Sequence, residues 1–220
     1  MAEVNLLRSL PSTKRQNLQR GDTPDVVRAA RQFGALYFDG PRACGYGGYH
    51  YDGRWIPVAR DIVAHYDLQP GMRVLDVGCA KGFLVKDLMK VCPGLEAFGL
   101  DISTYAVTHC EPEVIGRLHV GSADAPFPFP DMSFDAVLSV NTIHNLDRDG
   151  CVRALRELRR VARDPKNCFV QVDAWTTEEE KTLFESWCLT AITYLTPEEW
   201  FELFREAGYV GDHHWTILKG

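Results

Sequence analysis

The sequence predicts an α/β fold built on a doubly wound, mainly parallel sheet, and two observations lead to this prediction. From residue 73 onward, short β-branched and apolar runs alternate with segments of helical periodicity, a pattern typical of parallel strands joined by right-handed crossovers. The first run ends in a glycine-containing turn, VGCAKG, which leads into a predicted helix. The length of 220 residues fits one domain with one hydrophobic core.

The first 69 residues are irregular and rich in aromatic side chains. Thr23 followed by Pro24 predicts a helix start, and the apolar spacing continues this helix to about Ala35. The glycine- and tyrosine-rich stretch 38–55 predicts a loop, and a helix over residues 57–66 follows it. We expect residues 1–69 to form a lid or cap, and residues 70–220 to form the core of the same unit.

The core is predicted to contain five strands separated by helices. The strands are expected over residues 73–77, 96–102, 117–121, 134–140 and 167–175. The helices between them are expected over residues 83–91, about 105–110, and 150–162.

Two more helices and a closing strand are predicted after the fifth strand. Thr177 and Glu180 have the spacing of a capping box, which predicts the first of these helices. Thr196 with Pro197 begins the second helix, which Gly208 ends. Residues 214–220 then read as the closing strand.

Composition excludes several classes of protein. No apolar run approaches the roughly 18 to 20 residues of a membrane span, and the charged N-terminus does not read as a signal peptide, so we expect a cytoplasmic protein without membrane attachment. The seven cysteines form no CxxC pair, which favours free thiols over a zinc site, and we expect no metal. The net charge of −6 argues against a nucleic-acid partner.

The turn after the first strand contains Asp76, Gly78 and Gly82. Glycine lets a ligand approach the backbone, and the free amides at the start of the following helix attract anionic groups. In dinucleotide-binding enzymes this turn reads GxGxxG, whereas here it reads Gly78-x-x-x-Gly82 with Ala80 between them. The dinucleotide motif is therefore not matched.

Two further acidic residues follow the next two strands. Asp101 ends the second strand, where a carboxylate can accept hydrogen bonds from both hydroxyls of a ribose. Asp124, after Ser122 and Ala123, follows the third strand and can accept the amino proton of an adenine. The alternatives are that Asp101 caps a helix and that Asp124 forms a turn before the prolines.

Together these elements resemble the class I S-adenosylmethionine-dependent methyltransferases over about residues 70–175. VLDVGCAKG resembles the first motif of that family, in which an acidic residue precedes three glycines at alternate positions, and Ala80 replaces the middle glycine. The resemblance implies a Rossmann-like sheet of the methyltransferase type with an antiparallel closing strand. It also implies S-adenosyl-L-methionine as cofactor and S-adenosyl-L-homocysteine as product.

The resemblance implies a cofactor site at the strand ends, covered by tyrosines of the N-terminal loop whose faces attract the sulfonium cation. The same tyrosines read alternatively as an aromatic plug packed on the sheet. The residues expected to bind the cofactor are Tyr46, Tyr49, Asp76, Gly78, Cys79, Ala80, Gly82, Phe83, Asp101, Ile102, Ser122, Ala123, Asp124 and Asn141.

The segment SVNTIHNL after the fourth strand is where the family builds the wall that faces the methyl group. His144 reads either as a general base or as a hydrogen-bonded wall residue, and Asn141 is the second candidate catalytic residue. Methyltransferases that modify DNA bases place Asn or Asp before Pro-Pro and an aromatic residue here, and this chain does not. The residues expected to bind the acceptor are His50, Arg54, Trp55, Asn145, Trp187 and Tyr194.

The sequence thus predicts methyl transfer to an oxygen or nitrogen of a small molecule by in-line displacement, carried out by a monomer or homodimer. Two alternatives remain open. One is a nicotinamide-dependent oxidoreductase, which the absent GxGxxG disfavours. The other is a methyltransferase-like binding subunit without catalysis.

Overall fold

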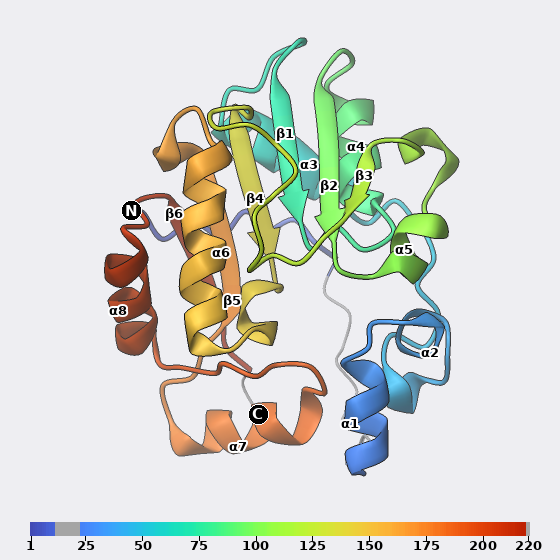
Figure 1. Ribbon diagram of the computed structural model, residues 1–220, viewed down its shortest axis with the longest axis vertical. Coiled ribbons are helices and arrows are strands. Elements are labelled where there is room, and N and C mark those ends of the chain that lie inside the picture. Colours follow the sequence, from blue (N-terminus) through green and yellow to red (C-terminus); the bar gives the residue numbers. More distant parts are fainter. Residues whose placement is uncertain (12–22, 219–220) are drawn as a thin grey trace.

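A computed structural model describes residues 1–11 and 23–218, and its centre is a six-stranded sheet (Figure 1). The strand order is β3-β2-β1-β4-β5-β6, and every pairing between neighbouring strands is parallel. The strands are β1 (Arg73–Val77), β2 (Glu96–Asp101), β3 (Leu118–Val120), β4 (Ala136–Val140), β5 (Cys168–Asp173) and β6 (Asp212–Thr216). The predicted α/β sheet is confirmed, and its order reverses between β1 and β4, where such sheets bind ligands.

Helices cover both faces of the sheet (Figure 1). On one face, α3 (Ile56–His65) and α4 (Phe83–Val91) pack over a core that includes Val74 and Leu138. On the other, α6 (Arg148–Val161) and α8 (Pro197–Ala207) pack over Leu75 and Val137. Successive strand residues point to opposite faces, so both faces of these strands are apolar.

Four further helices lie beyond the carboxyl ends of the strands (Figure 1). They are α1 (Pro24–Ala30), α2 (Ala35–Phe38), α5 (Thr104–Thr108) and α7 (Glu178–Trp187). The chain also forms short 3-10 turns η1 (Arg42–Cys44), η2 (Pro112–Val114), η3 (Ile143–Asn145) and η4 (Pro165–Asn167). No helix among the described residues is long and apolar enough to span a membrane.

The predicted antiparallel closing strand is wrong, because β6 runs parallel to β5. The chain reaches β6 through α7 and α8, and such a helical crossover returns it to the end of the sheet at which β5 began, as a parallel neighbour requires. The strand also begins at Asp212, two residues before the predicted start. The last two residues of the predicted strand, 219–220, lie outside the described residues.

Two parts of residues 1–69 pack on the sheet itself. Glu3 forms a parallel bridge with His213 of β6, and α3 belongs to a core layer of the sheet. The predicted helix over 23–35 is two helices, because Phe33 takes a left-handed backbone conformation with φ of 47° and Gly34 then begins α2. The part of this region that lies over the strand ends is therefore residues 23–55.

Candidate functional site

A cavity of about 320 Å³ lies at the carboxyl ends of β1, β2 and β4. Its inner wall is formed by the loops that follow these strands, and its outer wall by the N-terminal segment and the loop between α7 and α8. The structure places many of the predicted site residues on its lining: Tyr46, Tyr49, Trp55, Asp76, Gly78, Cys79, Ala80, Asp101, Ile102, Ser122, Ala123, Asn141 and Asn145.

The glycine turn after β1 is left-handed at three positions. Gly78 and Gly82 have φ of 87° and 77°, and Ala80 has φ of 50°. A Cβ atom on Gly78 would lie 1.8 Å from the Thr142 hydroxyl oxygen, so only glycine fits there. Ala80 keeps the left-handed conformation that the replaced glycine would favour, at a cost of about 1 to 2 kcal/mol. The departure from the family motif therefore leaves the path of the turn intact.

The Asp101 carboxylate closes this turn onto β2. Its Oδ2 accepts the backbone N–H of Ala80 at 2.7 Å, and its Oδ1 accepts the N–H of Ser103 at 2.8 Å. The residue is 9% exposed and lines the cavity. Each carboxylate oxygen has a second lone pair, so Asp101 can still accept two hydroxyl hydrogen bonds from a ribose.

Asp76 brings a second buried carboxyl group to the inner wall. It is 5% exposed, and burial, with the Asp101 carboxylate adding to the effect, raises its pKa to about 7. Burial also raises the pKa of Asp101. A bound cation would favour the charged form of both groups, so this pair fits a ligand that carries an ammonium and a sulfonium group.

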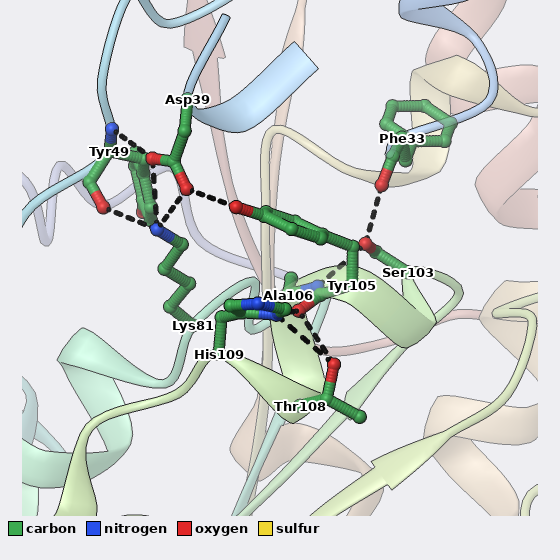
Figure 2. Close-up of polar contacts among 9 residues, drawn as sticks. All are labelled: Phe33, Asp39, Tyr49, Lys81, Ser103, Tyr105, Ala106, Thr108 and His109. Atoms are coloured by element: carbon green, nitrogen blue, oxygen red, sulfur yellow. Dashed lines mark hydrogen bonds and ion pairs between the residues drawn. The ribbon is translucent and has the colours of Figure 1, made fainter. Parts of the chain in front are cut away.

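The N-terminal segment is fastened over the cavity by polar contacts from the two strand-end loops (Figure 2). The Lys81 ammonium, on a side chain that is 9% exposed, donates to the Asp39 carboxylate at 2.7 and 2.9 Å and to the carbonyl of Tyr49 at 3.0 Å. The Tyr105 hydroxyl donates to Asp39 at 2.7 Å, and the Ser103 hydroxyl donates to the carbonyl of Phe33. Lys81 follows Ala80 directly, and Ser103 binds Asp101 through its N–H, so these fastening residues adjoin the Asp101 contacts.

Aromatic rings of the N-terminal segment pack on the start of α4. Tyr49 stacks on Phe83 with ring centroids 4.6 Å apart. The ring centroid of Tyr46 lies 4.4 Å from that of Tyr49. Both tyrosines line the cavity, whereas Phe83 lies behind Tyr49 and, like Gly82, does not line it. The tyrosines therefore pack on the core and line the cavity at once.

His144, predicted as either a general base or a hydrogen-bonded wall residue, is not among the residues that line the cavity. It is 3% exposed, its Nδ1 accepts the N–H of Asp173 at 3.2 Å, and its Nε2 lies 3.4 Å from the Asp173 carboxylate. Its carbonyl accepts the N–H groups of Ile192 and Thr193 at 2.9 and 3.0 Å. Burial lowers its pKa. His144 is the hydrogen-bonded residue behind the wall that the alternative interpretation describes.

Asp124 is also turned away from the cavity. Its carboxylate pairs with Arg153 of α6 at 2.8 Å and accepts the Ser122 hydroxyl. These two hydrogen bonds lower the pKa of Asp124. The cavity is lined instead by Ser122 and Ala123.

Four residues predicted to bind the acceptor lie elsewhere. Arg54 binds its neighbour Asp52, with Nε 2.8 Å from Oδ2, and Tyr194 stacks on Phe184 with centroids 3.7 Å apart. His50 is exposed, and neither it nor Trp187 lines the cavity. The segment that carries Tyr194 does contribute to the lining, but through Thr190 and Ile192.

Several lining residues were missed by sequence reasoning. They are side chains of the N-terminal helices and of the loop after β4: Arg31, Phe33, Tyr37, Phe38, Thr142 and Leu146. Nothing in the local pattern distinguishes them from helix and core residues, because their place on the lining arises from contacts between segments that are distant in the sequence, such as Phe33 with Ser103 and Arg31 with Ala191.

Known proteins with similar sequences are methyltransferases. A family model described as a methyltransferase domain matches residues 75–169. A sterol 24-C-methyltransferase of Gibberella zeae is 36% identical over 103 residues, 44% of this chain and 26% of that protein. A demethylmenaquinone methyltransferase of Symbiobacterium thermophilum is 26% identical over 204 residues, 76% of this chain and 80% of that protein. The match thus spans about a quarter of the first relative and four fifths of the second.

A solved structure supports the fold. In the complex between the Haloferax volcanii Trm112 methyltransferase activator and a methyltransferase, a chain 24% identical to this one matches with a TM-score of 0.55, covering 70% of this chain and 68% of that one. The acceptors named for further relatives range from a fatty acid to tRNA. The sequence motif and these matches agree that residues 75–169 form a methyltransferase domain, and the sheet has the fold of the class I S-adenosylmethionine-dependent methyltransferases.

Proposed function

We propose that this protein transfers a methyl group from S-adenosylmethionine to an oxygen or nitrogen of a small-molecule acceptor. The observation that carries the proposal is the pair of buried carboxyl groups, Asp76 near the end of β1 and Asp101 at the end of β2, on either side of the left-handed turn that lines a covered cavity. Asp101 would bind the ribose hydroxyls, and Asp76 would balance the positive charge of the methionyl ammonium. When bound, S-adenosylmethionine supplies an electrophilic methyl group on a sulfonium cation.

The chain's own contribution is to position the acceptor and to exclude water. Asn141 and Asn145 follow β4 and offer amide groups that can orient an acceptor atom, while Tyr46 and Tyr49 cover the opposite side. No histidine is found among the described lining residues. A neutral amine or an oxygen that is already ionised needs no proton acceptor from the chain, whereas a hydroxyl would depend on a lining carboxylate such as Asp76, whose pKa is about 7.

We also propose roles for the two parts of the chain, an oligomeric state and a cellular compartment. Residues 1–69 would serve as cover and flanking layer, and residues 70–220 as the catalytic core, in a monomer or homodimer. All seven cysteines are free thiols in the structure, which supports a reducing, cytoplasmic compartment. The net charge of −6 argues against RNA as acceptor, although one relative is named for tRNA methylation.

A methylation screen tests this proposal. Wild-type protein is incubated with methyl-labelled S-adenosylmethionine and pooled small metabolites, with bulk tRNA in a parallel arm, and products are identified by mass spectrometry. We expect labelled product from a metabolite pool and none with Asp101→Asn. Labelled tRNA alone would contradict the small-molecule acceptor. Binding of a nicotinamide dinucleotide in place of S-adenosylhomocysteine would favour an oxidoreductase, and cofactor binding without turnover in any pool would favour the non-catalytic subunit.

A further inference from the structure

The charged residues that line the cavity are separated by sign. Asp76 and Asp101 stand on the inner wall, at the ends of β1 and β2. Arg31, at the end of α1, is the single basic residue of the lining among the described residues. The inner wall therefore suits a cation, whereas the outer wall presents a guanidinium group.

Arg31 joins the two segments of the outer wall. Its Nη2 donates to the carbonyl of Ala191 at 3.1 Å, which links α1 to the loop between α7 and α8. No ion pair found among the described residues involves Arg31. A guanidinium has five N–H donors, so most of its capacity for an anion remains after this one contact.

Arg31 is exposed at the outer wall, and residues next to its partner Ala191 also line the cavity. Thr190 and Ile192 flank Ala191, and Ile192 is tied by its N–H to the carbonyl of His144, in the segment after β4. Phe33, two residues beyond Arg31, and Leu146 add apolar surface to the same cavity. An anionic group held here would have its apolar body against these side chains, apart from the carboxyl groups that suit the cofactor.

We propose that Arg31 binds a carboxylate of the methyl acceptor, whose apolar or aromatic body packs against Phe33, Leu146 and Ile192. This inference rests on the proposed function, because it assigns the acceptor of that same reaction to a chemical class. A carboxylate has a second source, the methionyl part of the cofactor, and the test must separate the two.

The test measures binding of neutral and charged probes of the same shape. Protein saturated with S-adenosylhomocysteine is titrated with cinnamate against cinnamamide, and with octanoate against octanamide. We expect wild type to prefer the carboxylate of at least one pair by roughly tenfold, as expected for hydrogen bonds to a charged partner. Arg31→Gln should lose this preference, and Arg31→Lys should keep part of it because the charge remains.

A matched control lies one turn earlier on the same helix. Arg28 is exposed and pairs with Asp25, so Arg28→Gln should keep the full preference. Loss of preference in Arg31→Gln but not in Arg31→Lys separates lost charge from a displaced wall. The affinity of Arg31→Gln for S-adenosylhomocysteine alone should stay within about threefold of wild type.

Three results would overturn the inference. The first is that wild type binds S-adenosylhomocysteine but binds acid and amide equally, or binds no probe at millimolar concentration. The proposed function would then stand without the inference about Arg31. The second is a tenfold loss of S-adenosylhomocysteine affinity in Arg31→Gln with an unchanged probe preference, which would assign Arg31 to the cofactor carboxylate. The third is failure of S-adenosylhomocysteine to bind wild type, which would remove the proposed function as well.

Discussion

The inner and outer walls of the cavity are built in different ways. The inner wall consists of loops that leave adjacent parallel strands, so the sheet register fixes Asp76 and Asp101 relative to each other. The outer wall consists of the N-terminal segment and the loop between α7 and α8, held by side-chain contacts such as Lys81 to Asp39. The fold itself therefore specifies the inner wall, where we propose that the cofactor binds, whereas a small number of long-range contacts specify the outer wall, where we propose that the acceptor binds.

Substitution of Asp101 on the inner wall should have the largest effect on the affinity for S-adenosylhomocysteine. Asp101→Ala removes the acceptor of two ribose hydroxyls, and hydrogen bonds to a charged group contribute about 1.5 to 3 kcal/mol each, so the affinity for S-adenosylhomocysteine should fall by roughly a hundredfold or more. Calorimetric titration measures this. Asp101→Asn, which keeps the side-chain volume, should also bind weakly, and Asp131→Ala on the surface should bind like wild type. Unchanged affinity in both Asp101 variants would place the ribose elsewhere.

The second largest effect is a pH dependence of stability and of S-adenosylhomocysteine affinity, which we assign to the titration of Asp76. Its pKa of about 7 lies above the ordinary value of 3.8, so this group lowers the stability of the unliganded protein as pH rises from about 4 to about 7. A bound ammonium needs the ionised form, so the affinity for S-adenosylhomocysteine should fall by up to about tenfold per pH unit below 7. Titrations at pH 5.5, 6.5 and 7.5 measure this slope.

The matched variant for this slope is Asp76→Asn, which cannot titrate at this position. Its affinity for S-adenosylhomocysteine should be lower at pH 7.5 and nearly flat across the same range. An equal slope in wild type and in Asp76→Asn would assign the pH dependence to another group.

Loosening the outer wall should have a smaller effect on the same ligand. Lys81→Met removes the ammonium that holds Asp39 and the Tyr49 carbonyl, so residues 33–49 should exchange amide hydrogens faster and the affinity for S-adenosylhomocysteine should fall by roughly tenfold. Hydrogen-exchange mass spectrometry resolves this segment. Lys166→Met, an exposed lysine of η4, serves as control. Unchanged exchange over residues 33–49 would show that other contacts hold the cover.

His144 tests whether a residue behind the wall affects stability rather than binding. His144→Gln should leave the N–H of Asp173 without its partner and lower the free energy of unfolding by about 1 to 3 kcal/mol, which denaturant titration measures. The affinity for S-adenosylhomocysteine should change less than about threefold. A fully stable variant that binds the cofactor but has lost all methyl transfer would restore His144 as a catalytic residue.

The smallest effect is expected at Asp124. Its carboxylate is engaged by Arg153, whose side chain is 49% exposed, so Asp124→Ala should alter S-adenosylhomocysteine affinity by less than about twofold. Calorimetric titration measures this affinity. A tenfold loss specific to S-adenosylhomocysteine, with no loss for 5′-methylthioribose, which lacks the base, would show that Asp124 contacts adenine as the sequence first indicated.

Sequence reasoning succeeded where a local pattern determines the structure. The β-branched runs, the glycine turn and the cap at Thr196 are properties of neighbouring residues, and the strands and helices that they predict are present. The start of β6 was missed because Asp212 and His213 do not resemble strand residues, although His213 is buried. Its direction was missed because strand direction follows from the connecting helices rather than from the strand's own residues.

The contrast between local and long-range contacts also explains which site residues could be predicted from the sequence. Asp76 and Asp101 were found because Asp76 lies two residues before Gly78 of the turn and Asp101 ends the next strand, and both positions can be read from the sequence. Arg31 was missed because it gains its place only when α1 lies against Ala191, 160 residues away. His144 was assigned a catalytic role because burial and the bond to Asp173 cannot be read from its neighbours in the sequence.

A crystal structure of the complex with S-adenosylhomocysteine tests the central claim most directly. We expect both ribose hydroxyls within hydrogen-bond distance, about 2.5 to 3.2 Å, of the Asp101 carboxylate, and the methionyl ammonium beside Asp76 under Tyr46 and Tyr49. A ligand bound outside the cavity, or a ribose that contacts neither Asp101 nor the turn at Gly78–Gly82, would contradict it.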